Sequence, residues 1–255
     1  MSIIESIVLA IIQGVTEFLP VSSSGHLVIA TKLFGMSNPD TNLSLIVFLH
    51  VFSLLAIIIS FYKEIFELLT QPKVILMIII ATIPAGLIGY LFEDYIQKLF
   101  EGTVLTGAAL MVTGIYIILT ELHWKRTEVN LEQAPLISAL WVGIAQAFAI
   151  IPGLSRSGLT ICTGLLNGYE KHESIKFSFF LALPVLAGAT VLKLRDFSQL
   201  KASFQPITIL ISGVICLLVS LLAIHLLIRL IRRRKLIYFG WYCLIAGILT
   251  VIFIR

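Results

Sequence analysis

Two short polar motifs interrupt apolar stretches of this chain, and they hold the side chains that could do chemistry. The first motif spans Gln13–His26 and the second spans Pro152–Thr160. Together they supply one carboxylate, one imidazole, one guanidinium and several hydroxyl groups. Ionisable groups inside long apolar stretches are energetically costly, so these side chains are candidates for function.

Glu17 is the only acidic residue of the first motif. It lies one helical turn after Gln13, so the two side chains share one face of a helix. A carboxylate at this position could bind a divalent cation or accept a proton. The alternative is an interfacial residue near a helix end, since Pro20 follows and would end the helix.

Three serines, Ser22, Ser23 and Ser24, follow that proline where the next helix should begin. Because the first N–H groups of a helix are unpaired and its dipole is positive there, this position can bind an anion. The alternative is ordinary capping of the helix by a serine. His26 lies within one turn of the serines and could serve as an acid, a base or a hydrogen-bond donor.

The second motif complements the first. Pro152 interrupts a helix, and Ser155 and Ser157 can cap the helix that follows. Arg156 lies between these serines, and its planar guanidinium can donate two parallel hydrogen bonds to a phosphate. Thr160 lies one turn further on the same helix face.

The two motifs together predict a site for a phosphate ester or a diphosphate that has an apolar tail. Phosphoryl transfer requires neutralisation of charge, an in-line nucleophile and an acid or base, and the motifs offer all three. The alternative for Arg156 is a structural salt bridge to Glu17. His50 and His225 lie in apolar segments outside the motifs, and we interpret them as packing or interhelical hydrogen-bonding residues.

The composition indicates which kind of protein must position these motifs. Of the 255 residues, 58% are hydrophobic and 13% are charged, and the mean hydropathy is +1.03. Because a soluble domain carries about 25% charged residues, the composition excludes a soluble protein, a disordered chain and a disulfide scaffold. The net charge of +4 does not indicate nucleic acid, since the basic residues lie between apolar runs. We predict an all-α, polytopic membrane protein.

The apolar runs differ in kind. A spanning helix needs about 20 residues to cross roughly 30 Å of hydrocarbon. The stretches 2–34 and 134–168 have helix breakers and polar groups at their centres and are too short for two spans, so we predict two re-entrant hairpins, each a helix, a break and a helix. Six further runs without charged residues predict six transmembrane helices: 43–62, 74–92, 102–120, 177–192, 202–228 and 236–254.

The two hairpins resemble one another. Gln13 precedes Ser22 by nine residues, and Gln146 precedes Ser155 by the same interval. Three predicted spans follow each hairpin, and because three is odd, the second unit must be inverted relative to the first. Such inverted repeats bring broken helices together near the membrane midplane. The predicted repeats are residues 1–122 and 134–255 of a single membrane domain, 1–255.

The basic residues predict the orientation, because cytoplasmic loops are enriched in Lys and Arg. Eleven of them fall on the side opposite the N-terminus and six on the N-terminal side, so we expect both termini outside and the site opening outward. The eleven are Lys63, Lys73, Lys125, Arg126, Lys171, Lys176, Arg229, Arg232, Arg233, Arg234 and Lys235, and the six are Lys32, Lys98, Lys193, Arg195, Lys201 and Arg255.

Four segments make the chain resemble the bacterial undecaprenyl-diphosphatases, the bacitracin-resistance family. Gln13–His26 and Pro152–Thr160 resemble the two signature motifs of that family, and Ala81–Gly86 and Phe177–Pro184 extend the resemblance over essentially the whole chain. The family hydrolyses undecaprenyl diphosphate to the monophosphate and inorganic phosphate with a divalent cation, which renews the lipid carrier for peptidoglycan and other envelope polymers. The resemblance implies this activity, a Mg²⁺ or Ca²⁺ cofactor, and six spans with two re-entrant hairpins.

Roles for single residues are carried over by position. The resemblance implies that Glu17 is the essential acidic residue and metal ligand, and that Arg156 clamps the phosphate. It implies that Ser23 is the nucleophile or orients the substrate, and that His26 is a catalytic partner. Many members have glutamate where this chain has Gln13, so Glu17 would carry the metal or base role nearly alone. We expect further substrate contacts from Gln13, Ser22, Ser24, Ser155, Ser157 and Thr160.

The alternative function is a membrane transporter or lipid flippase, because inverted repeats with broken helices are typical of transporters. A purely structural scaffold is disfavoured by the buried Glu17 and Arg156. The expected partners are a polyprenyl diphosphate, membrane lipid and a second copy in a homodimer, with no nucleic acid. The expected location is the bacterial plasma (inner) membrane, with several passes.

Overall fold

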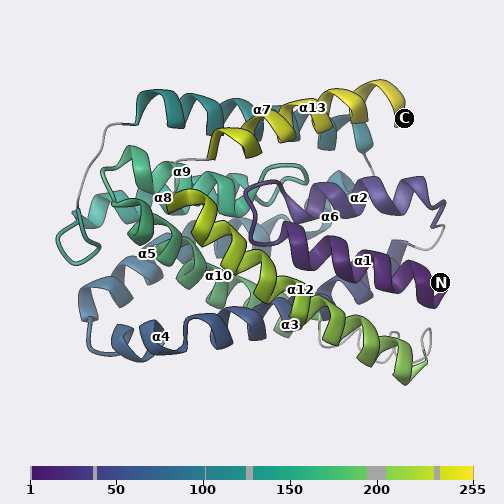
Figure 1. Ribbon diagram of the computed structural model, residues 1–255, viewed down its shortest axis with the longest axis horizontal. Coiled ribbons are helices and arrows are strands. Elements are labelled where there is room, and N and C mark those ends of the chain that lie inside the picture. The colour runs from purple at the N-terminus through teal and green to yellow at the C-terminus, as the bar shows by residue number, and fades with distance from the viewer. Residues whose placement is uncertain are drawn as a thin grey trace.

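The computed structural model describes residues 2–36, 39–100, 102–124, 129–193, 205–232 and 236–254 (Figure 1). Within these ranges the regular elements are helices, and an isolated bridge joins Val129 and Tyr169. The prediction of an all-α membrane protein is therefore confirmed.

Both predicted hairpins consist of two short helices separated by a break. The first holds α1 (Ile3–Thr16) and α2 (Ser23–Leu33), and the second holds α8 (Leu136–Phe148) and α9 (Arg156–Leu166). With 14 and 13 residues, α1 and α8 each rise roughly 20 Å, which is too short to cross the hydrocarbon. The helix breaks therefore lie inside the molecule, as the sequence predicts.

Six longer helices cover the predicted spans, although one of them is bent. Five are long and apolar enough to cross a membrane, and α3 makes a sixth if it is joined to α4 (Tyr62–Leu68) across a bend of 78°. The hydropathy pattern predicts neither α4 nor α6 (Glu93–Leu99). The six are α3 (Pro39–Ser60), α5 (Pro72–Leu91), α7 (Thr103–His123), α10 (Lys171–Lys193), α12 (Pro206–Arg232) and α13 (Leu236–Phe253).

The last long helices of the two predicted repeats, α7 and α13, lie side by side at one edge of the molecule (Figure 1). Glycines bring their backbones close together. A Cβ atom at Gly114 would lie 2.6 Å from the carbonyl oxygen of Gly240, and one at Gly107 would lie 2.9 Å from that of Gly247. Small residues at such contacts are the usual means of packing helices in lipid, where no hydrophobic force drives them together.

The first arm of each hairpin packs on a long helix from the other half of the chain. α1 lies against α12, where a Cβ atom at Gly14 would lie 2.8 Å from the carbonyl oxygen of Cys216. α8 lies against α5, where a Cβ atom at Gly143 would lie 2.7 Å from Ala81 Cα. The halves thus interlock, and their division into inverted repeats stays a prediction.

The two hairpin breaks touch one another. A Cβ atom at Gly25 would lie 3.0 Å from Gly153 Cα, and Ser157 Oγ donates across the contact to the carbonyl oxygen of Leu19 at 3.0 Å. Gly153 has a φ of 99°, a left-handed value that favours glycine, and the carbonyl oxygen of Thr106 fills the place of its missing Cβ. This contact positions the polar motifs of both hairpins in one region.

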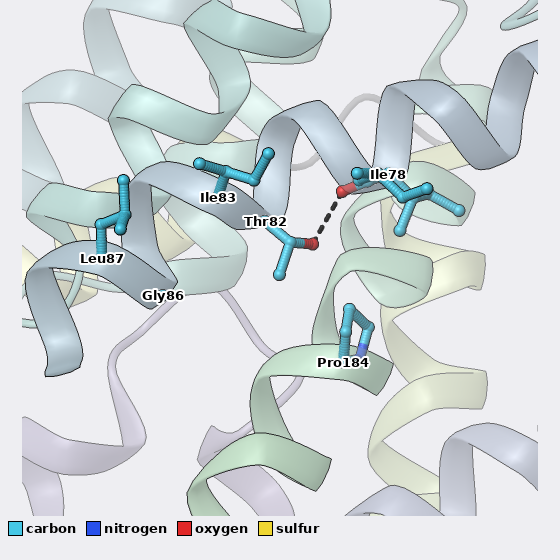
Figure 2. A pocket seen from close by; sticks show the side chains of 7 residues that line it. Ile78, Thr82, Ile83, Gly86, Leu87 and Pro184 are labelled. Atoms are coloured by element: carbon cyan, nitrogen blue, oxygen red, sulfur yellow. Dashed lines mark hydrogen bonds between the residues drawn. The ribbon is translucent and has the colours of Figure 1, made fainter.

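Apolar side chains cover the outer surface, as expected for helices that face lipid. A shallow groove of about 400 Å³ lies between α5 and α10, where Thr82 faces Pro184 (Figure 2). None of the predicted site residues lines it. The lining residues are Ile78, Ile79, Thr82, Ile83, Gly86, Leu87 and Pro184.

Candidate active site

Glu17 lies at the centre of a buried polar cluster where the two hairpins meet. Only 7% of this residue is exposed. Its Oε1 accepts a hydrogen bond from Arg156 Nη2 at 2.8 Å, and its Oε2 accepts from Ser23 Oγ at 2.6 Å and from Gln13 Nε2 at 3.1 Å. Three other predicted site residues, drawn from both motifs, therefore converge on the Glu17 carboxylate, and the chemical roles of all four stay predictions.

Matching serine caps build the two helix starts beside this carboxylate. Ser22 Oγ accepts from the Gly25 N–H at 3.2 Å, and Ser155 Oγ accepts from the Gly158 N–H at 3.1 Å. The capping interpretation is thus confirmed for both serines. Ser22 also has a φ of 70°, which is uncommon outside glycine and costs on the order of 1–3 kcal/mol.

The hydroxyl groups of Ser24 and Ser157 point back to these caps. Ser24 Oγ lies 3.2 Å from Ser22 Oγ, and Ser157 Oγ lies 3.3 Å from Ser155 Oγ. Ser24 is partly exposed, whereas Ser157 is buried. Of the two, Ser24 is therefore better placed to reach a bound molecule.

Arg156 joins the second hairpin to both Glu17 and α10. Its Nη1 donates to the carbonyl oxygen of Ser178 at 3.2 Å, while Nη2 forms the salt bridge to Glu17. The side chain is 13% exposed, and these contacts use two of its five N–H donors. The salt bridge that the sequence left as an alternative is present, and donors remain for a phosphate.

Thr160 contributes to packing within the second hairpin. Its hydroxyl donates to the carbonyl oxygen of Arg156 at 2.8 Å and lies 2.7 Å from Ser178 Oγ. The residue is 1% exposed, and no described hydrogen bond joins it to Glu17. These contacts hold the first turn of α9 against α10, so they orient the guanidinium of Arg156.

His26 lies on the first turn of α2 and points toward α13. Its Nδ1 lies 2.8 Å from the carbonyl oxygen of Ser22, and its Nε2 lies 2.7 Å from the hydroxyl of Tyr242. No described hydrogen bond joins His26 to Glu17. The predicted catalytic partner is thus held by two groups, one of which comes from the end of the chain.

Three polar residues belong to this cluster although neither sequence motif contains them. His50 Nε2 lies 3.7 Å from Glu17 Oε2, and Gln13 Nε2 donates to Ser53 Oγ at 3.5 Å. His50 and Ser53 are three residues apart on α3 and so lie on one face of that helix. A polar pair on one face of an otherwise apolar helix is the sequence feature that could have identified them. Tyr242 carried no comparable signal, because aromatic residues are common in membrane helices.

The donor atoms of the cluster include a set that suits a cation. Among the described residues, no group of three or more His, Cys, Asp or Glu side chains could hold a metal ion. However, Gln13 Oε1 is buried and accepts no hydrogen bond within the described part of the chain. Glu17, Ser23 and this amide oxygen are oxygen donors, the type that Mg²⁺ and Ca²⁺ prefer. The amide nitrogen Nε2 faces Glu17 in the structure, so the amide must turn over for Oε1 to reach a cation bound by Glu17. These donors fit a cation whose remaining ligands come from phosphate and water.

An apolar groove of about 370 Å³ begins beside the second hairpin break. Leu154 and Leu159, which flank the serines and Arg156, form one wall of this groove between α7, α8 and α9. The position suits an apolar chain attached to a group bound at the helix start. The other lining residues are Val112, Tyr116, Trp141, Ile144, Ala145, Phe148 and Thr163.

Known proteins are similar in sequence to this chain over nearly its whole length. A family model described as bacitracin resistance protein BacA matches residues 6–249. An undecaprenyl-diphosphatase of Methanococcus vannielii is 36% identical, covering 98% of this chain and 100% of the relative. Undecaprenyl-diphosphatase 1 of Shouchella clausii is 36% identical, covering 99% and 97%, and the undecaprenyl-diphosphatase of Halothermothrix orenii is 38% identical, covering 99% and 98%.

Proposed function

The chain belongs to the bacitracin resistance protein BacA family, and from this membership we infer that it is an undecaprenyl-diphosphatase. It hydrolyses undecaprenyl diphosphate to undecaprenyl phosphate and inorganic phosphate in a membrane, and so renews the lipid carrier for cell wall polymers. The observation that carries this inference is the convergence of Ser23 and Arg156 on Glu17 within a chain that matches the family throughout.

We propose that Arg156 and the two helix starts hold the diphosphate. Within the described part of the chain, two of the five N–H donors of Arg156 have partners, and the N-termini of α2 and α9 attract anions. The apolar groove beside Leu159 supports binding of the attached lipid chain. Arg156 would then share its guanidinium between Glu17 and the phosphate oxygens.

Glu17 is the proton acceptor in this proposal. The attacking oxygen, either that of Ser23 or that of a water held by Ser23, bonds to the terminal phosphorus and gives its proton to Glu17. The bond from phosphorus to the bridging oxygen breaks, and undecaprenyl phosphate leaves with that oxygen. If Ser23 attacks, a water then hydrolyses the phosphoserine. The 2.6 Å contact between Ser23 Oγ and Glu17 Oε2 supports this assignment.

We propose that a divalent cation, Mg²⁺ or Ca²⁺, is held by Glu17, Gln13 Oε1 and phosphate oxygens. When bound, such a cation neutralises phosphate charge and so favours attack at phosphorus. The buried amide oxygen of Gln13, which has no described partner, supports this site.

A phosphate-release assay tests the function and the cation together. Purified protein in detergent is expected to release phosphate from a polyprenyl diphosphate and none from the corresponding monophosphate. A chelator should lower the rate by at least about 10²-fold, because a bound cation contributes several kcal/mol. Added Mg²⁺ or Ca²⁺ should restore it. Absence of phosphate release, with lipid moving between vesicle leaflets, would contradict the hydrolase and favour a flippase.

We propose that both termini lie outside the bacterial plasma (inner) membrane and that the site opens outward. α1 begins and α13 ends at the same end of the molecule, which supports placing both termini on one side (Figure 1). The excess of basic residues on the other side supports calling that side cytoplasmic. Of the basic residues counted, five on the cytoplasmic side and three on the outer side fall outside the described ranges: Lys125, Arg126, Arg233, Arg234 and Lys235, and Arg195, Lys201 and Arg255.

Cysteine labelling tests this orientation. A membrane-impermeant thiol reagent added outside intact cells should modify Phe92→Cys, after α5, and spare Thr70→Cys, before α5. Both positions are exposed, while the native Cys162, Cys216 and Cys243 are buried and should not react. Labelling of Thr70→Cys alone would reverse the orientation. Association of two copies stays a prediction.

A further inference from the structure

Ser22 and Tyr242 contact the two ring nitrogens of His26. A carbonyl oxygen can only accept a hydrogen bond, so His26 Nδ1 must carry a proton to reach the Ser22 carbonyl at 2.8 Å. In the neutral ring Nε2 then has a lone pair, and the Tyr242 hydroxyl donates to it at 2.7 Å. The Ser22 carbonyl therefore sets the tautomer of His26, and the Tyr242 hydroxyl, which can donate or accept, binds the remaining lone pair at Nε2.

Tyr242 also restricts the orientation of the imidazole ring. The two rings are nearly parallel, with an angle of 8° between their planes and 5.6 Å between their centroids. Tyr242 is 48% exposed, so its ring lies at the boundary of the cluster and not in the packed core. A half-exposed phenol contributes little to packing, and this leaves its contact with His26 as its main described interaction.

The two halves of the chain can be compared position by position, and residues present in only one half are candidates for chemistry. The cap serines Ser22 and Ser155 are 133 residues apart, the difference between 155 and 22. The same separation joins Gly25 to Gly158, Gly107 to Gly240 and Gly114 to Gly247. The glycine contacts between α7 and α13 follow the same relation. Gly107 contacts Gly247, and the counterparts of these two residues, Gly240 and Gly114, contact one another.

At the positions that correspond to His26 and Tyr242, the other half has Leu159 and Ala109. These two residues are buried in one apolar cluster with Leu154. At these two positions the second hairpin packs on α7 with apolar side chains, and the polar contact between α7 and α9 is made by other residues, Tyr116 and Thr163. Glu17 shows the same asymmetry, because its counterpart is Ile150. Tyr242 therefore departs from the repeat in the same way as the residues that carry the chemistry.

We propose that Tyr242 is a positioning residue for hydrolysis, which acts through His26: its hydroxyl donates to Nε2 and so fixes the orientation of the imidazole ring, whose tautomer the Ser22 carbonyl sets. The proposal rests on the proposed diphosphatase function. It assigns a role to α13, a helix that contributes no residue to either polar motif.

The test is a double-mutant cycle with Tyr242→Phe and His26→Ala. Tyr242→Phe keeps the ring and removes the hydroxyl, so kcat should fall about 3- to 10-fold, the value of one neutral hydrogen bond, with KM unchanged. In the His26→Ala background the same change should have no further effect, because the group through which Tyr242 acts is missing. The matched control is Tyr169→Phe, which removes a phenol hydroxyl that contacts Ser138 on α8, outside both polar motifs and the apolar groove.

A spectroscopic measurement makes the result independent of turnover. In protein with ¹⁵N-labelled histidine, the Nε2 signal that is lost in His26→Ala should shift in Tyr242→Phe and stay in place in Tyr169→Phe. Full activity of Tyr242→Phe, or losses that simply add in the double variant, would overturn the positioning role while leaving the diphosphatase intact. An inactive wild-type protein would overturn the function, and an unshifted Nε2 signal would overturn the contact itself.

Discussion

Replacing Arg156 with lysine is expected to lower kcat/KM for diphosphate hydrolysis by at least about 10²-fold, the cost of removing one preorganised donor from a transition state. Lysine keeps the positive charge beside Glu17 but loses the planar fork that reaches both Glu17 and the Ser178 carbonyl. Phosphate release from purified protein, measured over a range of substrate concentrations, gives the result.

The variant must also distinguish a phosphate clamp from a structural salt bridge. Arg156→Ala would leave Glu17 as an unpaired buried carboxylate and cost about 3–5 kcal/mol of stability, so its loss of activity alone proves little. Arg156→Lys keeps the ion pair and should unfold near the wild-type temperature. Arg229→Lys is the control, because that exposed arginine lies on α12 and contacts His225 on the same helix. Normal turnover of Arg156→Lys would show that charge alone is needed.

The positions of the hairpins and spans could be predicted because the bilayer restricts which helices are allowed. A span must be about 20 apolar residues long, so the length and polarity of the short stretches around Pro20 and Pro152 are enough to assign them to hairpins. The meeting of Glu17 with Arg156 was also predictable, because each is the one charged residue of its motif. Glu17 and Arg156 are therefore identified twice, by their reactive side chains and by their position inside apolar stretches.

The remaining contacts depend on how helices from distant parts of the chain are rotated against one another. Tyr242 reaches His26 across 216 residues, and this depends on the glycine contacts that set α13 against α7. Nothing in the composition of α13 specifies that rotation. His50 was interpreted as a packing or interhelical hydrogen-bonding residue, and the sequence did not show that its interhelical partner would be Glu17. The contact of the Thr160 hydroxyl with Ser178 on α10 has the same origin, and substrate binding by Thr160 stays a prediction.

Replacing Glu17 with glutamine is expected to abolish phosphate release, a loss of at least about 10³-fold. The carboxylate accepts hydrogen bonds from Ser23 and Arg156, and in the proposed reaction it also takes the proton of the attacking oxygen. Glutamine keeps the size of the side chain but can neither accept that proton nor balance the charge of Arg156. Initial rates with the polyprenyl diphosphate, with and without added Mg²⁺, measure the change.

Two further variants show whether the loss of activity in Glu17→Gln comes from the chemistry of the carboxylate or from a structural role. Glu121→Gln removes another mostly buried carboxylate, one that pairs with Lys171 away from the cluster, and this variant should keep the wild-type activity.

Gln13→Glu places a second carboxylate beside Glu17, at a position whose amide nitrogen now lies 3.1 Å from Glu17 Oε2. Two carboxylates so close repel one another unless a cation lies between them. Gln13→Glu should therefore remain active and need less Mg²⁺ for half-maximal rate. If Glu17→Gln retains near-normal turnover, or Gln13→Glu is inactive at every cation concentration, then the carboxylate is structural and the cation binds elsewhere.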